Sequence, residues 1–130
     1  RLVKMLIHAD RPVKCARVAI LGLTFKENVP DLRNSRVPDI VTELQQFGIQ
    51  PMVHDPVADA DEAEKEYGIR LADWSELGDL DGIVLAVAHR QYHSISDCLR
   101  EWLRPGAVVV DVKCQIKPCD VPDRAHYWSL

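Results

Sequence analysis

Positively charged side chains occur in a short segment that joins an apolar run to the start of a predicted helix. This segment, Gly22–Ser35, reads GLTFKENVPDLRNS and contains Lys26 and Arg33 together with two carboxylates. With Arg36, which directly follows, the local charge is +1, within a chain whose net charge is −4. Cations beside free backbone N–H groups at a helix N-terminus commonly bind phosphate. We therefore expect a local anion site here, with Lys26 as a phosphate ligand or, in the simpler reading, a solvated loop lysine.

Three other side chains could complete such a site, and each has a structural alternative. Arg33 could bind an anion or could pair with Asp31. Lys113 follows an apolar run, so its ammonium group must reach solvent or an anion, unless Asp111 neutralises it. Phe25 could present its ring to a base or sugar, or it could belong to the core.

Histidines and cysteines suggest little catalytic chemistry. His89 and His93 lie just past a predicted strand and could act as acid or base near neutral pH, although histidines are common in loops. The four cysteines have no paired two-residue spacing, and we expect buried free thiols. Cys114 and Cys119, with His126 nearby, lack the tight spacing of a structural zinc site. The sequence therefore offers no obvious nucleophile, paired carboxylates or metal site.

Buried strands and amphipathic helices alternate along the chain. Continuous apolar runs at 17–23, 81–87 and 107–112 predict strands buried on both faces, and a shorter strand is expected at 50–54. Helices are expected from the N-cap Ser35 to Gly48, over 59–67 before Gly68, and from a capping box at Ser94–Asp97 to Leu103. A brief strand at 69–71 and a helical turn at 74–77 complete the pattern. This alternation predicts a Rossmann-like three-layer α/β domain with a mainly parallel sheet.

The first residues predict the end of a longer helix. Leu2–Ile7 has helical spacing, and Arg1 has no preceding residue that could cap it. We expect residues 1–14 to be the end of a preceding helix with a linker, and residues 15–130 to form the domain itself. Part of the function would then lie in a larger protein.

Composition excludes several classes of partner. The balance of 16 Lys and Arg against 20 Asp and Glu, with no basic run, argues against nucleic acid and anionic membranes. No apolar run reaches the roughly 18 residues of a spanning helix, and the charged first residues do not suit a signal peptide. The sequence thus favours a cytoplasmic protein that binds a small phosphorylated ligand. It lacks G-x-G-x-x-G, so NAD would not be held here in the usual way.

The motif at Gly22–Ser35 closely resembles the opening motif of the C-terminal UDP-binding domain of UDP-glucose/GDP-mannose dehydrogenases. Its form T-F-K-E-N-x-x-D-x-R-N-S looks most like bacterial members that oxidise UDP-N-acetylhexosamines. The segments His54–Pro56, Ala86–His89 and Val110–Lys113 are also similar, so the resemblance covers nearly the whole chain.

The resemblance implies a fragment of an NAD-dependent enzyme that oxidises the sugar C6 alcohol of a UDP-sugar, a UDP-N-acetylgalactosamine or UDP-N-acetylglucosamine, in surface polysaccharide synthesis. Phe25, Lys26 and Lys113 would contact the UDP-sugar and Arg33 the cofactor. Lys113 stands where many relatives carry arginine. Catalytic residues and most of the NAD site would lie in missing upstream domains, so the isolated domain would be inactive and the whole enzyme a homo-oligomer.

The alternative is a non-catalytic α/β nucleotide-binding or assembly module. A phospho-receiver module would need acidic residues at the end of the first strand, and the run Val18–Leu23 has none. An assembly module would expose an apolar patch.

Overall fold

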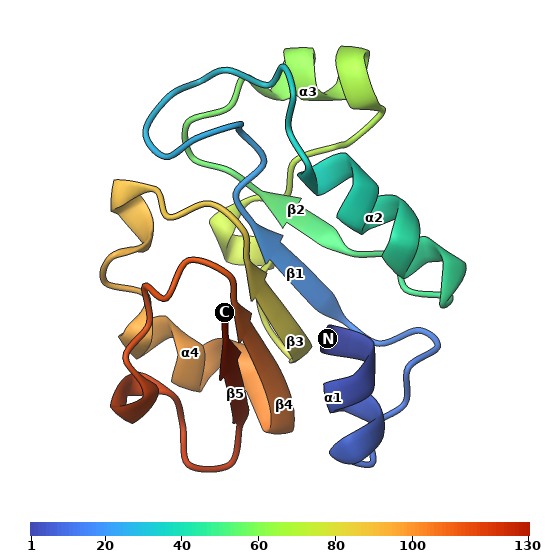
Figure 1. The fold of residues 1–130 in the computed structure, drawn as a ribbon, viewed down its shortest axis with the longest axis vertical. Helices are drawn as coiled ribbons and strands as arrows, with labels where there is room; N and C mark the ends of the chain where they lie inside the picture. Colours follow the sequence, from blue (N-terminus) through green and yellow to red (C-terminus); the bar gives the residue numbers. More distant parts are fainter.

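The computed structural model describes all residues, Arg1–Leu130, as one layer of strands between two layers of helices (Figure 1). The helices are α1 (Leu2–His8), α2 (Val37–Gln46), α3 (Ala60–Tyr67) and α4 (Ser96–Trp102), with 3₁₀ turns η1 (Trp74–Glu76), η2 (Arg90–Tyr92) and η3 (Pro118–Asp120). The strands are β1 (Val18–Leu21), β2 (Met52–His54), β3 (Leu80–Leu85), β4 (Leu103–Asp111) and β5 (His126–Ser129). The predicted three-layer α/β fold is confirmed.

The five strands form one sheet in the order β2-β1-β3-β4-β5, and every neighbouring pair is parallel. The chain moves from β1 outward to β2 and then returns to place β3 on the other side of β1. The order therefore reverses between β1 and β3, and ligands of such sheets bind in the crevice beyond the strand ends at this point. The sheet places that crevice beside the loop Gly22–Ser35, which directly follows β1.

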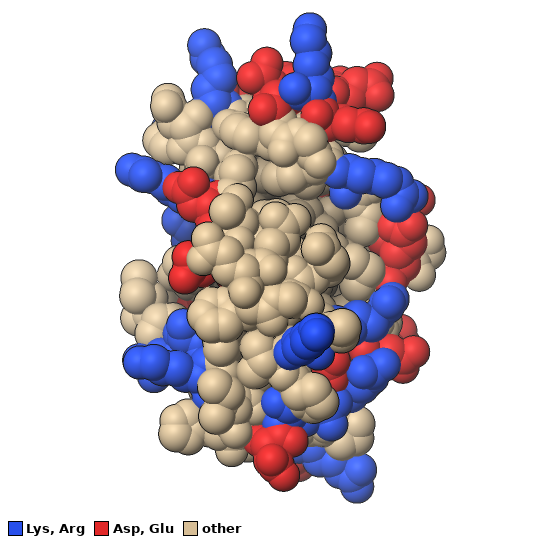
Figure 2. Space-filling model, turned by 90° about the vertical axis from the view of Figure 1, so that its right-hand side faces the viewer, with Lys and Arg blue, Asp and Glu red and all other residues tan.

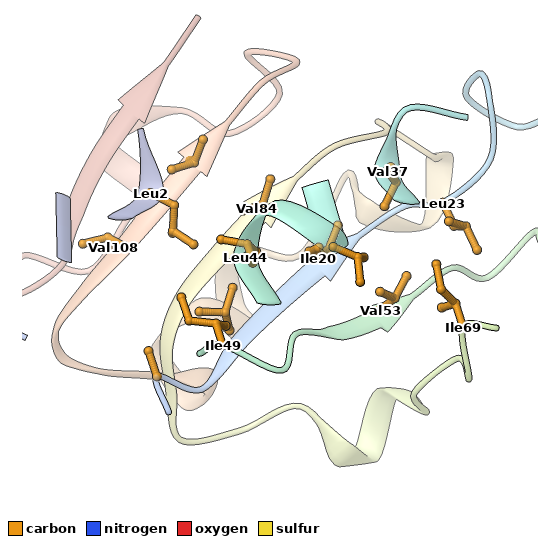
Figure 3. Packing of buried hydrophobic residues seen from close by; sticks show 14 of the residues in the cluster. Leu2, Ile20, Leu23, Val37, Leu44, Ile49, Val53, Ile69, Val84 and Val108 are labelled. Atoms are coloured by element: carbon orange, nitrogen blue, oxygen red, sulfur yellow. The ribbon is translucent and has the colours of Figure 1, made fainter. Parts of the chain in front are cut away.

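Alternate residues of the central strands enter two separate cores, as the pleat requires. Ile20 and Val84 join a cluster under α1 and α2, which Figure 3 shows from close by. Ala19 and Ile83 join a second cluster under α4 and η2. All residues of β1 and β3 are buried, so both faces of the sheet are covered and the continuous apolar runs are explained.

Four local predictions were wrong. The strand β5 was not expected, and the predicted strand at 69–71 is a single bridge between Val53 and Leu71. The helix α4 begins at Ser96 without a side-chain cap, so the capping box at Ser94 does not form. The N-cap of α2 is Arg36, although the Ser35 hydroxyl accepts the Val37 N–H at 3.2 Å.

The cysteines are free, but they are not buried as expected. Cys15, Cys114 and Cys119 are exposed, and Cys98 is half-buried. Cys15 and Cys114 have positive φ angles of 63° and 54°, so they occupy turns at the surface and not strands. Turn geometry outweighs the usual preference of cysteine for the interior.

No helix of the structure combines the length and the hydrophobicity that a bilayer crossing requires.

Candidate functional site

Two loops meet in the crevice between the carboxyl ends of β1 and β3. The first is Gly22–Ser35, and the second is the segment 86–93 that leads from β3 into η2. Gly22 brings them together, because its φ of +102° lets the chain turn immediately beside Val87. A Cβ at this position would lie 2.5 Å from the Val87 Cβ, so only glycine permits this approach.

A buried carboxylate, Asp55, holds the beginning of the first loop. One of its oxygens accepts the backbone N–H groups of Leu23 at 2.6 Å and Thr24 at 3.0 Å. The other oxygen accepts the N–H groups of Val57 and Ala58 at 2.8 and 2.9 Å. Asp55 thus joins the exit of β1 to the exit of β2, in addition to the backbone hydrogen bond from the Gly22 N–H to the His54 carbonyl at 2.8 Å.

His89 supplies a fifth hydrogen bond to Asp55 and links it to the second loop. Its Nε2 lies 2.9 Å from the Asp55 carboxylate and 3.0 Å from the Thr24 hydroxyl, whose proton goes to the Lys26 carbonyl. Its Nδ1 accepts the backbone N–H of Asn28 at 2.9 Å. These partners assign the proton to Nε2 and the lone pair to Nδ1.

The position of His89 excludes it from acid–base chemistry on a ligand. Its side chain is fully buried, and both ring nitrogens are engaged within the protein. His89 is therefore a structural residue that shapes the loop. His93, by contrast, is exposed after η2 and makes no side-chain hydrogen bond to the protein.

The pKa of Asp55 reflects this network. Burial alone raises the pKa of a carboxyl group, but the hydrogen bonds from His89 and from the Leu23, Thr24 and Val57 amides outweigh it. The pKa of Asp55 is therefore well below its ordinary value. The carboxylate stays ionised and keeps all its acceptor sites at neutral pH.

Asn28 locks the tip of the loop. Its φ is +63°, a left-handed conformation that asparagine tolerates better than most residues. Its side-chain oxygen accepts the Arg90 N–H at 2.8 Å, while its own N–H reaches His89. The two loops are thus joined by hydrogen bonds in both directions.

Two substitutions of Asn28 separate the effect of its hydrogen bond to Arg90 from the effect of its positive φ. Asn28→Gly loses the bond to Arg90 but accepts the positive φ, so we expect a loss of about 1 kcal/mol in the free energy of unfolding. Asn28→Ala adds backbone strain, which brings the loss to roughly 2 kcal/mol. Urea unfolding of both variants measures the difference. An alanine variant as stable as the glycine variant would contradict the strained loop geometry.

The buried network leaves the motif's aromatic and cationic side chains outside. Phe25 is 54% exposed, so it is not a core residue, and Lys26 beside it is exposed and forms no ion pair. A hollow of about 390 Å³ lies next to Phe25 and is also lined by Ser35 and Arg36. Phe25 and Lys26 are therefore available to a ligand in this crevice.

Lys113 lies beyond the carboxyl end of β4, on the same edge of the sheet. Its backbone N–H donates to Asp111, but its exposed ammonium group has no ion pair. Asp111 is buried and accepts instead from the Ile116 N–H and the Tyr127 hydroxyl. Asp111 therefore shapes the turn after β4 and leaves the charge of Lys113 free.

Arg33 forms the pair with Asp31 that its sequence neighbourhood suggests. The guanidinium Nε lies 3.1 Å from the carboxylate, and hydrogen bonds from Arg33 lower the pKa of Asp31. The Arg33 side chain is nevertheless 84% exposed, so part of its guanidinium faces solvent. The pair orients Arg33 without enclosing it.

This geometry defines an α/β domain whose candidate ligand crevice lies at a topological switch point and is bordered by cations. The chain belongs to the UDP-glucose/GDP-mannose dehydrogenase family, because the model of that family's UDP binding domain matches residues 19–118. The chain is 43% identical over 114 residues to a UDP-N-acetyl-D-glucosamine 6-dehydrogenase of Pseudomonas aeruginosa, covering 87% of this chain and 27% of that protein. It is 36% identical over 129 residues to the protein CapL of Staphylococcus aureus, covering 99% and 30%.

Solved structures support the fold. The structure of an NDP-N-acetyl-D-galactosaminuronic acid dehydrogenase from Methanosarcina mazei Go1 superposes with a TM-score of 0.85 at 23% identity, covering 98% of this chain and 27% of that one. The chain thus spans less than a third of the length of these relatives.

Proposed function

We propose that this chain is the UDP-sugar-binding domain of an NAD-dependent UDP-sugar 6-dehydrogenase. The sugar would be UDP-N-acetylglucosamine or UDP-N-acetylgalactosamine, and the product a uronic acid for surface polysaccharide synthesis in the cytoplasm. The observation that carries this proposal is the exposed pair Phe25 and Lys26, held at the switch point by a buried network. Family membership and the named activity of the Pseudomonas relative supply the ligand class.

The residues of the crevice suit a nucleotide diphosphate. Lys26 and Lys113 lie on loops after β1 and β4, and neither ammonium group is neutralised by a carboxylate. We assign both to the diphosphate and Phe25 to the face of the base or sugar. A lysine at position 113 acts as a point charge and lacks the planar fork of arginine.

The role of the domain in catalysis would be to anchor the substrate. Binding energy from the non-reacting nucleotide can be used to position the sugar for reaction. NAD, when bound, supplies the hydride acceptor for each of two oxidation steps at C6. The solvent-facing part of the Arg33 guanidinium fits a contact with that cofactor, while the remaining NAD site and the catalytic groups belong to other domains of the same enzyme.

An apolar groove on the face of the sheet beside α1 supports the proposal that further residues of the same enzyme precede Arg1. It encloses about 730 Å³ beside the first turn of α1, with Phe47, which directly follows α2, on one side and Val110 and Trp128 of the sheet also in its lining. Figure 2 views the molecule from the side of α1 and α2, and the middle of this face is mostly uncharged. We assign the groove to residues upstream of Arg1 that extend α1 backward along the sheet, consistent with residues 1–14 being the end of a longer helix and a linker.

Removing the charge of Lys26 tests the proposed ligand. A charge-assisted hydrogen bond contributes about 1.5–3 kcal/mol, so Lys26→Ala should weaken UDP binding about 10-fold to 150-fold in calorimetric titration. Lys14→Ala removes an exposed lysine that precedes β1, at the opposite end of the sheet, and should leave the affinity unchanged. Equal affinities of the wild-type chain and Lys26→Ala would remove Lys26 from the site.

A separate experiment tests whether catalysis requires the other domains of the enzyme. The 130-residue chain mixed with NAD and a UDP-N-acetylhexosamine should form no NADH, as followed by NADH absorbance. Production of NADH by this chain alone would contradict the assignment of catalysis to other domains.

A further inference from the structure

Three arginines line one hollow at the end of the sheet opposite the UDP crevice. Arg100 comes from the last turn of α4, Arg104 from the start of β4, and Arg124 from the segment that leads into β5. The hollow has a volume of about 380 Å³. In Figure 1 these elements meet below the sheet, away from the loop between β1 and α2.

The positive charge in this hollow is incompletely neutralised. Arg100 and Arg124 form no ion pair, and the lining contains one carboxylate, Asp123, which has no ion pair either. Arg104 contacts Asp81 at 3.3 Å, but that carboxylate already binds Arg11 at 2.5 Å.

The architecture keeps the three arginines around the same hollow. The Gly106 N–H donates to the Arg124 carbonyl at 2.8 Å, which fixes the two segments side by side. Arg104 donates two hydrogen bonds to the Asp81 carboxylate, at 3.3 and 3.4 Å. Leu103, Pro105, Val121 and Pro122 add apolar walls between the charges. Such a mixture of apolar surface and a few placed charges is typical of small-molecule pockets.

We propose that this pocket binds a small organic phosphate with at least two negative charges, at a site separate from the UDP crevice. Guanidinium groups from three elements can approach a tetrahedral phosphate from three directions, whereas a planar carboxylate presents its two oxygens in one plane. The apolar walls would contact the organic part of the ligand. Because the pocket lies at the amino ends of the strands, it can be filled while UDP occupies the crevice.

Pyrophosphate is the probe for this site, titrated into the 130-residue chain that is already saturated with UDP. Calorimetry should give one site per chain, and NMR shifts should fall on residues 119–125 and on the arginine Nε–H groups. The double variant Arg100→Gln/Arg124→Gln should weaken this binding at least 10-fold. A matched double variant, Lys4→Gln/Lys14→Gln, lowers the net charge equally outside the pocket and should bind pyrophosphate as tightly as the wild-type chain.

Three results would overturn the proposal. They are an absence of pyrophosphate binding in the presence of UDP, equal binding by the two double variants, and equal binding of citrate and pyrophosphate. The last result would show selection for charge alone and not for phosphate. Thermal unfolding followed by circular dichroism checks that both double variants are folded, which is expected because the substituted side chains are exposed.

Discussion

Asp55→Asn should destabilise the chain by about 3–5 kcal/mol, the largest effect of any single polar substitution in the site. The side chain of Asp55 is fully buried and accepts five hydrogen bonds. An asparagine can keep only one carbonyl oxygen, so its NH₂ group would face N–H donors of the Leu23 and Thr24 backbone or of the following turn. Urea unfolding measures the loss.

A matched substitution shows whether this cost comes from the buried network. Asp59 is the exposed N-cap of α3 and accepts the Glu62 N–H at 2.9 Å. Asparagine is an equally good N-cap, so Asp59→Asn should change the free energy of unfolding by less than about 0.5 kcal/mol. Similar losses in the two variants would contradict the central role of Asp55.

The same carboxylate predicts a pH dependence. The pKa of Asp55 is lower in the folded chain than in the unfolded chain, where an aspartate titrates near about 3.9. Its contribution to stability is therefore complete above that value and is lost as the pH falls through it toward the folded pKa. Wild-type stability should drop more steeply below about pH 4 than that of Asp55→Asn. Parallel curves would contradict this assignment.

Gly22→Ala should cost about 2–5 kcal/mol, the second largest effect, because two penalties combine at this residue. The positive φ of 102° disfavours a side chain by about 1–2 kcal/mol, and the added Cβ would force Val87 away at a further cost of about 1–3 kcal/mol. The displacement would also separate the two loops of the crevice.

Gly68 provides the control for backbone strain alone. Its φ is +66°, but no heavy atom lies within 4 Å of an added Cβ. Gly68→Ala should therefore cost only about 1 kcal/mol. Thermal or urea unfolding compares the losses in the free energy of unfolding of Gly22→Ala and Gly68→Ala. Equal losses would contradict an added cost from the close approach of Gly22 to Val87.

Sequence patterns identified the central strands for a clear physical reason. The run of β1 and the residues Ile83–Leu85 of β3 are apolar because both faces of the sheet are covered. The edge strand β5 was missed because its four residues are half-buried or exposed and resemble a loop. Local pattern therefore revealed the strands that contain buried residues and missed β5, which contains none.

The exposed side chains that we propose as ligand contacts were easier to select from the sequence than the buried network that supports their loop. Phe25 and Lys26 belong to one contiguous motif, and the structure leaves both exposed. Asp55 and His89, in contrast, are separated by 34 residues and meet only because parallel strands end at the same edge. The sequence placed both at strand ends but carried no signal that they bond to each other.

The most direct test of the account is an NMR titration of the 130-residue chain with UDP. Backbone amide shifts should fall in three places along the carboxyl edge of the sheet: the loop Gly22–Ser35, the segment 86–93, and the residues around Lys113. Saturable shifts at these loops would support UDP binding at the switch point. Shifts confined to the amino ends of the strands, or no saturable shifts at all, would contradict it.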